Sequence, residues 1–185
     1  MAGLERVVLA SSNAGKLADF RRLFAGAGFE LMSPAELGVT LTVNESGTTF
    51  AENARLKARA AYEATGLPAL GDDSGLCVYA LGGRPGVSSA RYAGPGADDR
   101  ANNAKLLAEL EGVRDRRAAF VCVLALVLPG GEELVAEGRC EGTIAPAERG
   151  TNGFGYDPIF YCEELGATFG EIGPRNGGAF VAHVV

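Results

Sequence analysis

The sequence predicts an α/β protein in which a mixed β-sheet is flanked by helices. Three observations indicate this class. A strand-like apolar segment at residues 6–10 leads into a stretch of helical periodicity, an alanine-rich helical segment precedes another apolar run at residues 76–81, and a β-rich run at residues 118–128 enters a proline-glycine turn. Strands that alternate with helices favour parallel pairing, whereas strands joined by a tight turn pair antiparallel.

The first third of the chain has the pattern strand, loop, helix, strand. Residues 6–10 are expected to form a buried strand, and a short second strand is expected at residues 29–32. From Lys16 onward, apolar positions recur at helical spacing until glycines end the helix. These apolar positions are Leu17, Phe20, Leu23 and Phe24.

A second helix is expected to begin at a capping box. In Thr49-Phe50-Ala51-Glu52 the threonine and glutamate side chains would satisfy free amides at a helix start. The alanine-rich helix should run to about Thr65, because Gly66 and Pro68 stop it.

The segment Asp72-Asp73-Ser74-Gly75 is expected to form a turn before the strand at residues 76–81, since Asp, Ser and Gly favour turns. The following loop, residues 82–96, is too rich in glycine and proline for regular structure.

A third helix, capped by Asp98 or Asp99, should follow this loop. The strand at residues 118–128 should then turn at residues 129–132 and pair with a strand at residues 134–140.

The composition is that of an ordinary globular protein. The 185 residues are 47% hydrophobic and 22% charged, which predicts a single domain over residues 1–185 with a substantial core. No apolar stretch reaches the roughly 18 residues of a membrane span, and the start lacks the features of a signal peptide. We therefore expect a soluble, cytoplasmic protein without a membrane partner.

The net charge and the few cysteine and histidine residues argue against several functional classes, namely nucleic-acid binding, zinc binding and catalysis by histidine. The net charge of −6 disfavours DNA or RNA, which would require clustered lysine and arginine. The four cysteines form no CxxC pair, so a zinc site has little support. His183 is the only histidine, and we therefore expect carboxylates to carry any proton transfer.

A candidate phosphate-binding segment, Ser11-Ser12-Asn13-Ala14-Gly15-Lys16, lies between the first predicted strand and the first predicted helix. Free backbone amides and the helix dipole favour a phosphate there, and Lys16 would add a positive charge. The segment is not a P-loop, because Ser11 and Leu17 stand where that motif requires glycine and serine or threonine. An ordinary turn with an exposed lysine is the alternative.

Three acidic residues are candidates for a metal site. Asp72 and Asp73 are adjacent, and their mutual repulsion must be relieved by water, a cation or a proton. If Glu45 meets them, the oxygen-rich set suits Mg²⁺, which binds substrate phosphates and polarises them while a carboxylate takes a proton from water. The alternatives are a solvated turn for the pair and a solvated loop position for Glu45.

The loop Gly153-Phe154-Gly155-Tyr156-Asp157-Pro158 places two aromatic residues and an acid among glycines. A planar ring could stack on Phe154, with backbone groups or Asp157 contacting the edge of that ring. A loop that anchors the core is the alternative.

Several motifs, taken in chain order over approximately residues 5–172, resemble those of the house-cleaning inosine/xanthosine triphosphate pyrophosphatases. The motifs are Ser11 to Lys16, Thr49 to Ala54, Asp72 to Gly75, Leu81 to Gly86 with Ser89 to Tyr92, and Gly153 to Phe160. The resemblance implies an α/β fold with a mixed sheet and two lobes around a central cleft, usually as a homodimer. It also implies Mg²⁺-dependent conversion of ITP, dITP or XTP into the monophosphate and pyrophosphate, which clears such nucleotides from the pool.

The resemblance also implies roles for single residues. It gives Glu45 and Asp73 to the metal and the activation of water to Asp73, while Asp72 stays open as the proton acceptor because coupled carboxylates titrate as a unit. Ser74 is implied as a further substrate contact. The triphosphate is implied to bind Ser11, Ser12, Asn13, Ala14, Gly15 and Lys16, and the nucleoside Phe154, Gly155, Tyr156 and Asp157.

The end of the chain departs from the family pattern after residue 172. No lysine stands where a substrate lysine is expected, and His183 is followed by Val184 where the family has arginine. We therefore expect a shortened or replaced C-terminus, and base selectivity and affinity are the properties that this expectation concerns. Two alternatives follow: a nucleotide-binding protein with impaired catalysis, and a pyrophosphatase of different base preference that resembles the Maf-type enzymes.

Overall fold

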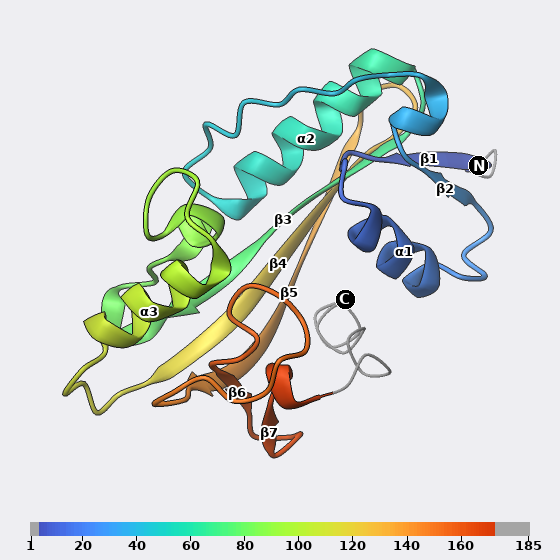
Figure 1. Cartoon of the computed structure of the whole chain (residues 1–185). Helices are drawn as coiled ribbons and strands as arrows, with labels where there is room; N and C mark the ends of the chain where they lie inside the picture. The colour runs from blue at the N-terminus through green and yellow to red at the C-terminus, as the bar shows by residue number, and fades with distance from the viewer. Residues whose placement is uncertain (1–3, 173–185) are drawn as a thin grey trace. The chain divides into compact units, whose positions relative to one another are not determined.

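The computed structural model describes residues 4–172 (Figure 1). Within this range, seven strands form one sheet in the order β2-β1-β3-β4-β5-β6-β7. The strands are β1 Arg6–Leu9, β2 Glu30–Met32, β3 Ala69–Val78, β4 Arg117–Val127, β5 Glu133–Ile144, β6 Phe160–Cys162 and β7 Ala167–Thr168. The α-helices are α1 Ala14–Leu23, α2 Phe50–Thr65 and α3 Asp99–Glu109, and short 3-10 helices lie at Ala35–Leu37, Tyr79–Leu81, Gly86–Arg91 and Phe169–Glu171.

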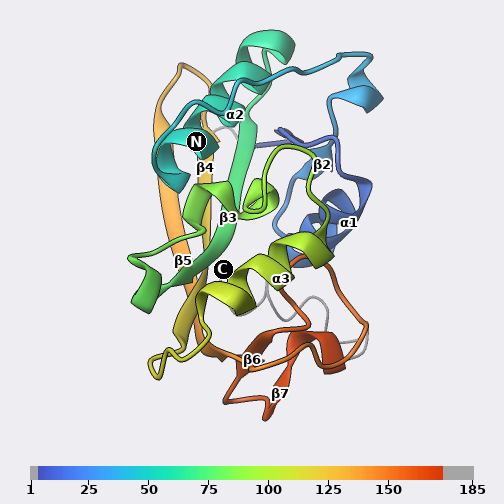
Figure 2. The ribbon, with the colours of Figure 1, turned by 60° about the vertical axis from the view of Figure 1, so that its left-hand side comes forward.

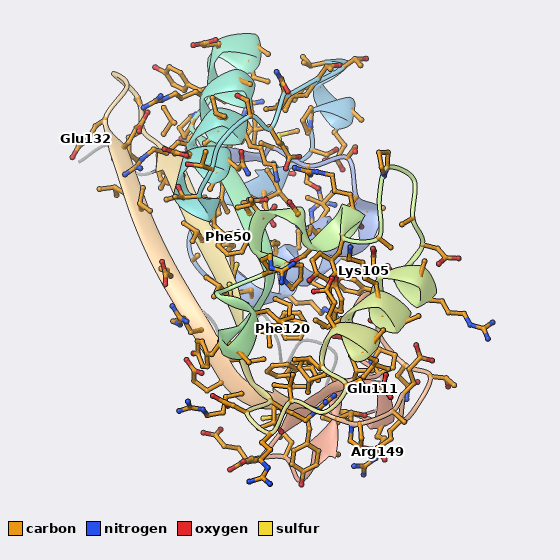
Figure 3. All side chains as sticks on the ribbon, turned by 90° about the vertical axis from the view of Figure 1, so that its left-hand side faces the viewer. Phe50, Lys105, Glu111, Phe120, Glu132 and Arg149 are labelled. Carbon is orange, nitrogen blue, oxygen red and sulfur yellow. The ribbon has the colours of Figure 1, made fainter. Side chains whose placement is uncertain are left out.

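The sheet is mixed. β1 pairs in parallel with β2 and β3, so that Val8 lies opposite both Met32 and Ala69. β6 pairs antiparallel with β5 and β7. β4 and β5 are neighbours joined by a tight turn, in which the Leu128 amide donates to the Glu132 carbonyl at 2.8 Å and Glu132 marks the tip (Figure 3). The predicted mixed sheet flanked by helices is confirmed.

The chain forms two compact units, and β3, β4 and β5 run through both. Of the described residues, the first unit contains 4–73 and 122–137, and the second contains 74–121 and 138–172. The expected arrangement of two lobes around a central cleft remains a prediction.

The helices begin at the capping residues that the sequence indicates. The Thr49 hydroxyl accepts from the Glu52 amide, and the Glu52 carboxylate accepts from the Thr49 amide, which is the predicted capping box of α2. Gly66 follows α2 with a φ of +68° and ends it. Asp98 caps α3 by accepting from the Ala101 amide. No helix in residues 4–172 is long and apolar enough to cross a membrane.

Helix α2 lies along β3 (Figure 2). The two elements are in direct contact at Gly71. A Cβ atom at Gly71 would lie 2.6 Å from the Ala58 nitrogen and would overlap the Ala54 carbonyl oxygen. Ala54, Ala58 and Ala61 are completely buried, and their spacing places them on one face of α2. Small side chains on both elements therefore bring the helix backbone against the strand, just before the two adjacent aspartates.

Three aromatic rings form part of the core of the second unit. Phe120, from β4, is one of them (Figure 3). The centroid of its ring lies 4.6 Å from that of Phe160, and the Phe160 centroid lies 5.1 Å from that of Phe169. All three residues are buried. Tilted aromatic contacts of this kind add stability beyond the buried area, and here they hold the short strand β6 in the core.

The predicted turn at residues 72–75 is wrong, because these residues lie inside β3 and are mostly buried. The prediction rested on the preference of Asp, Ser and Gly for turns. A buried strand tolerates two aspartates here because side chains from α1 and α2 bind both carboxylates, as described below.

Some boundaries also differ from the prediction. β3 ends at Val78 instead of residue 81, since Tyr79–Leu81 forms a 3-10 helix that ends at Gly82 with a φ of +66°. The loop predicted to be irregular contains the 3-10 helix Gly86–Arg91. β5 extends to Ile144 because its last residues pair with β6.

We expect Gly71→Ala to destabilise the protein by about 1–3 kcal/mol or more. The added methyl group would overlap backbone atoms of α2, which can be relieved only by a shift of the helix. Denaturant unfolding followed by circular dichroism measures the change. The control Ala136→Ser, at an exposed position of β5, should change the free energy of unfolding by less than about 0.5 kcal/mol. An unchanged unfolding midpoint for Gly71→Ala would contradict the close packing of α2 on β3.

Candidate functional site

The first unit contains a cavity of about 610 Å³. Its walls come from the loop after β1, the start of α1, the segment before α2, and single residues of α2 and β3. The lining residues are Ala10, Ser11, Ser12, Asn13, Ala14, Lys16, Leu17, Ser33, Pro34, Ala35, Val39, Thr40, Leu41, Val43, Glu45, Lys57 and Asp72. The cavity therefore unites most of the predicted phosphate-binding segment with two of the three predicted acidic residues.

The predicted phosphate-binding segment forms the start of α1. The Asn13 side chain caps the helix by accepting from the Lys16 amide at 3.1 Å, and the Ser11 hydroxyl accepts from the Asn13 amide at 3.2 Å. Ala14 and Gly15 form the first turn, whose amide groups point out of the helix start. The positive end of the helix dipole favours an anion at this end of the cavity.

The two adjacent aspartates are each held by a lysine. The Lys16 ammonium lies 2.5 Å from a carboxylate oxygen of Asp72, which is only 2% exposed. The Lys57 ammonium lies 2.9 Å from Oδ1 of Asp73, which is 7% exposed. These ion pairs relieve the repulsion that two neighbouring carboxylates in a buried strand would otherwise suffer.

Glu45 shares its cation with Asp73. The Lys57 ammonium lies 3.1 Å from Oε2 of Glu45 and also donates to the Asp72 carbonyl at 3.1 Å. The structure thus brings Glu45 and Asp73 to one side of the first unit, on a single ammonium group.

Asn53 completes the hydrogen bonding of Asp73. Its side-chain amide donates to Oδ2 of Asp73 at 3.1 Å, and its carbonyl oxygen accepts from the Gly47 amide at 2.9 Å. Asn53 is buried, and it lies one turn before Lys57 on the same face of α2. One helix face therefore fixes both oxygens of Asp73 and the loop that follows Glu45.

Opposing influences act on the pKa of Lys57. Burial lowers the pKa, but the hydrogen bond and charge of Asp73, together with the charge of Glu45, outweigh this effect and raise the pKa above its ordinary value. Lys57 consequently stays protonated at neutral pH and supplies one positive charge between the two carboxylates.

The donor set is chemically suited to Mg²⁺. Residues 4–172 contain no group of three or more His, Cys, Asp or Glu side chains that could hold a metal ion. The carboxylates of Glu45 and Asp73 nevertheless converge on one ammonium group. Two hard oxygen ligands beside the predicted phosphate-binding segment fit Mg²⁺, which uses one or two carboxylates together with waters and substrate phosphates.

The predicted nucleoside-binding loop lies in the second unit and combines an exposed ring with a buried one. Phe154 is 69% exposed, whereas Tyr156 is 4% exposed and its hydroxyl donates to the Ser89 carbonyl at 2.8 Å. The Asp157 carboxylate accepts from the Phe154 amide at 2.9 Å. The core-anchoring alternative thus describes Tyr156, while the Phe154 ring is available for a planar ligand.

Ser74 and the chain terminus complete the placement of the predicted residues. Ser74 follows Asp73 in β3, is half-buried and belongs to the second unit. The departures at Gly173 to Val185, His183 among them, lie outside the described residues.

Sequence reasoning did not assign Asn53, Lys57 and the cavity wall at residues 39–41 and 43. Asn53 and Lys57 stand four residues apart on an alanine-rich helix, so that both polar side chains fall on one face. Asn53 directly follows the capping box, and Lys57 lies one turn later. This spacing of two polar residues on an alanine-rich helix is the signal that could have identified them.

We expect Lys57→Met to destabilise the protein by about 3 kcal/mol, because it leaves the buried Asp73 carboxylate without its cation. Denaturant unfolding at pH 7 measures the change. The control Lys105→Met removes an exposed lysine that pairs with Glu109 one turn away, and should cost less than about 1 kcal/mol. Equal losses in the two variants would contradict the role given to Lys57.

We expect a pH-dependent contribution to stability from Asp157. Burial raises the pKa of Asp157 to about 6, while the Phe154 amide lowers it and the charge of Asp99 raises it further. The folded protein therefore binds this proton more tightly than the unfolded chain, whose value is 3.8. The contribution is complete only below the unfolded value of 3.8 and is lost as the pH rises from there through about 6.

Unfolding free energies measured from pH 4 to pH 7 test this expectation. Relative to Asp157→Asn, which cannot titrate, the unchanged protein should lose roughly 2–3 kcal/mol between pH 4 and pH 6. The control Asp115→Asn changes an exposed aspartate whose pKa is lowered to about 2 by Arg117. This variant retains Asp157, so its stability should fall between pH 4 and pH 6 in parallel with that of the unchanged protein. Parallel curves for the unchanged protein and Asp157→Asn would refute the assignment.

Known proteins resemble this chain over nearly its whole length. The model of the Ham1 family matches residues 7–178. A dITP/XTP pyrophosphatase from Geobacillus kaustophilus is 51% identical over 175 residues, covering 94% of this chain and 86% of that protein. The enzyme of the same name from Burkholderia pseudomallei is 54% identical over 178 residues, covering 94% and 85%. The structure of a HAM1 protein from Coxiella burnetii matches with a TM-score of 0.87 and 44% identity, covering 95% of this chain and 91% of that one. These matches confirm the resemblance found in the motifs, and the chain belongs to the Ham1 family.

Proposed function

We propose that this protein is a nucleoside triphosphate pyrophosphatase that hydrolyses ITP, dITP and XTP to the monophosphate and pyrophosphate, and so removes these nucleotides from the pool. The relatives from Geobacillus kaustophilus and Burkholderia pseudomallei are both named dITP/XTP pyrophosphatases, and half of their aligned residues or more are identical to this chain. The observation that carries the proposal is the cavity of the first unit, whose lining includes a helix start, Lys16, Glu45, Asp72 and Lys57. Asp73 does not line the cavity but pairs with Lys57, which does.

Positive groups in this cavity suit a triphosphate. The start of α1, with Ser11, Ser12, Asn13, Ala14 and Gly15, offers amide and hydroxyl donors, and Lys16 adds a mobile positive charge. Its ammonium can exchange the Asp72 carboxylate for a phosphate oxygen, since its side chain is one-third exposed. Glu45 and Asp73 would hold Mg²⁺, which supplies charge neutralisation and polarisation of the phosphoryl oxygens when it is bound.

Asp73 is the proposed general base. It takes a proton from a water molecule whose oxygen attacks the phosphorus between the nucleoside and the departing pyrophosphate. The bond from that phosphorus to the pyrophosphate oxygen breaks, so that pyrophosphate leaves. Lys57 and Asn53 fix both oxygens of Asp73, which orients the carboxylate for this transfer. Asp72, bound by Lys16, is the alternative acceptor within the coupled pair.

Nucleoside recognition is proposed for the loop of the second unit. The exposed ring of Phe154 offers a stacking surface for the purine, and Gly155 and Asp157 offer polar groups at its edge. Tyr156 contributes by anchoring this loop, and Ser74 is a further proposed contact. A homodimer in the cytoplasm is proposed on the family resemblance alone, and light scattering on the purified protein measures the number of subunits.

A nucleotide panel tests the function. With Mg²⁺, we expect pyrophosphate release from ITP, dITP and XTP to exceed release from GTP, dTTP and UTP, and a chelator should abolish it. Asp73→Asn should lower the rate by at least about 10²-fold because it removes the base. The control Asp115→Asn, at an exposed aspartate, should keep the full rate.

Other outcomes would refute the proposal in distinguishable ways. Orthophosphate as the primary product excludes this bond cleavage. ITP binding without turnover indicates a nucleotide-binding protein with impaired catalysis. A preference for dTTP or UTP indicates a pyrophosphatase of different base preference, and an unchanged rate in Asp73→Asn removes Asp73 from its role.

A further inference from the structure

The exposed ring of Phe154 stands on a loop whose backbone is fixed from several directions. The Phe154 amide donates to the Asp157 carboxylate at 2.9 Å, and the Phe154 carbonyl accepts from the Asp157 amide at 3.2 Å. Gly153 has a φ of +78°, and a Cβ atom there would overlap the Asp157 carboxylate. An exposed aromatic side chain on so constrained a loop is unusual, because exposed loops are ordinarily mobile.

Two side chains of α3 hold the peptide groups of Gly155. The Gly155 amide donates to Oδ2 of Asp99 at 2.7 Å, and the Gly155 carbonyl accepts from the Asn103 side-chain amide at 3.1 Å. Asp99 and Asn103 are four residues apart and therefore lie on one face of α3. We refer to Asp99 and Asn103 together as the α3 clamp.

Asp98 and Asp99, at the start of α3, accept hydrogen bonds from different parts of the chain. Asp98 is the N-cap and accepts from the Ala101 amide at 2.7 Å. Asp99 is thereby free of the capping function, and its carboxylate reaches the Gly155 amide. The helix start favours an acidic side chain at this position, and the Asp99 carboxylate there accepts from the Gly155 amide.

Asn103 keeps its position at an energetic cost. It is only 2% exposed, and its Oδ1 has no hydrogen-bond partner among the described residues. A buried acceptor without a partner is destabilising, so a leucine of similar size would be expected here unless the amide donors were needed. Those donors contact the Gly155 carbonyl at 3.1 Å and the Glu148 carboxylate at 3.3 Å.

We propose that Asp99 and Asn103 are positioning residues that hold Gly155 so that the Phe154 ring is presented, already ordered, to the base of the nucleotide. This inference rests on the proposed function. It extends that function by adding two residues that do not touch the substrate and act through the Phe154-Gly155 backbone.

The α3 clamp should act on binding more than on chemistry. An ordered ring loses less conformational freedom on stacking than a mobile one, which strengthens binding without a new contact. Stacking on the base is equal in the ground state and the transition state, because the reaction occurs at phosphorus. Its loss should therefore raise KM and leave kcat nearly unchanged.

Steady-state kinetics with ITP provide the first test. Asp99→Ala and Asn103→Leu should each raise KM by about tenfold, on the order expected when a base–aromatic stack is weakened. Neither substitution should raise KM further in a Phe154→Ala background, because the clamp acts through that ring. Asp99→Asn, which retains an acceptor, should restore most of the affinity, and the exposed neighbour variant Arg100→Ala is the matched control.

A fluorescence measurement tests the clamp without reference to activity. The chain contains no tryptophan, so Phe154→Trp introduces a single reporter at the tip of the loop. Asp99→Ala in this background should lower the steady-state anisotropy of the tryptophan, whereas Asp99→Asn and Arg100→Ala should leave it unchanged. Circular dichroism establishes that each variant is folded.

Three results would overturn the inference. These are an unchanged KM in both clamp variants, an equal rise in KM with and without Phe154, and an anisotropy that does not depend on Asp99. Absence of pyrophosphate release from every variant, including the unchanged protein, would instead refute the proposed function and with it the nucleotide role of the clamp. The anisotropy would then still decide whether α3 orders the loop.

Discussion

The ion pairs of Lys57 with Asp73 and Glu45 are the interactions on which the candidate site depends. Two adjacent aspartates in a buried strand would repel each other and lose their hydration, which a fold cannot sustain without cations. Lys57 binds Asp73 and Glu45 together, and Lys16 binds Asp72. These ion pairs hold the two carboxylates in the strand, with Asp72 and Lys57 at the wall of a cavity that suits a polyphosphate.

The position of Lys57 follows from how α2 lies on the sheet. Gly71 and the small residues of α2 let the helix backbone touch β3, so that a lysine on α2 reaches the carboxylate next to the contact. The capping box fixes where the helix begins and thus which side chains face the strand. Asn53 then joins Asp73 to the Gly47 amide, near Glu45. The close packing of α2 on β3 therefore sets where the cation for Asp73 lies.

In the second unit, as in the first, two polar side chains four residues apart on one helix hold a group of another segment. On α2, Asn53 and Lys57 are four residues apart and fix a carboxylate, and on α3, Asp99 and Asn103 are four residues apart and fix a glycine. In each case a capped helix start provides a rigid base for two polar side chains on one face. A rigid helix positions a functional group more reliably than a loop does alone.

The sequence by itself determined the elements whose signals are local: the capped starts of α2 and α3, the glycine stop after α2, and the turn between β4 and β5. Its motifs also identified the family. Only the tertiary structure decided that Asp72 and Asp73 lie within a strand, that Lys16 pairs with Asp72 and Lys57 with Asp73, and that Tyr156 is buried while Phe154 is exposed. The physical reason is the sequence separation between the interacting residues. A cap joins residues three apart, whereas the burial of a charge depends on partners such as Lys57 for Asp73, 16 residues away, and Lys16 for Asp72, 56 residues away, which only the folded chain brings together.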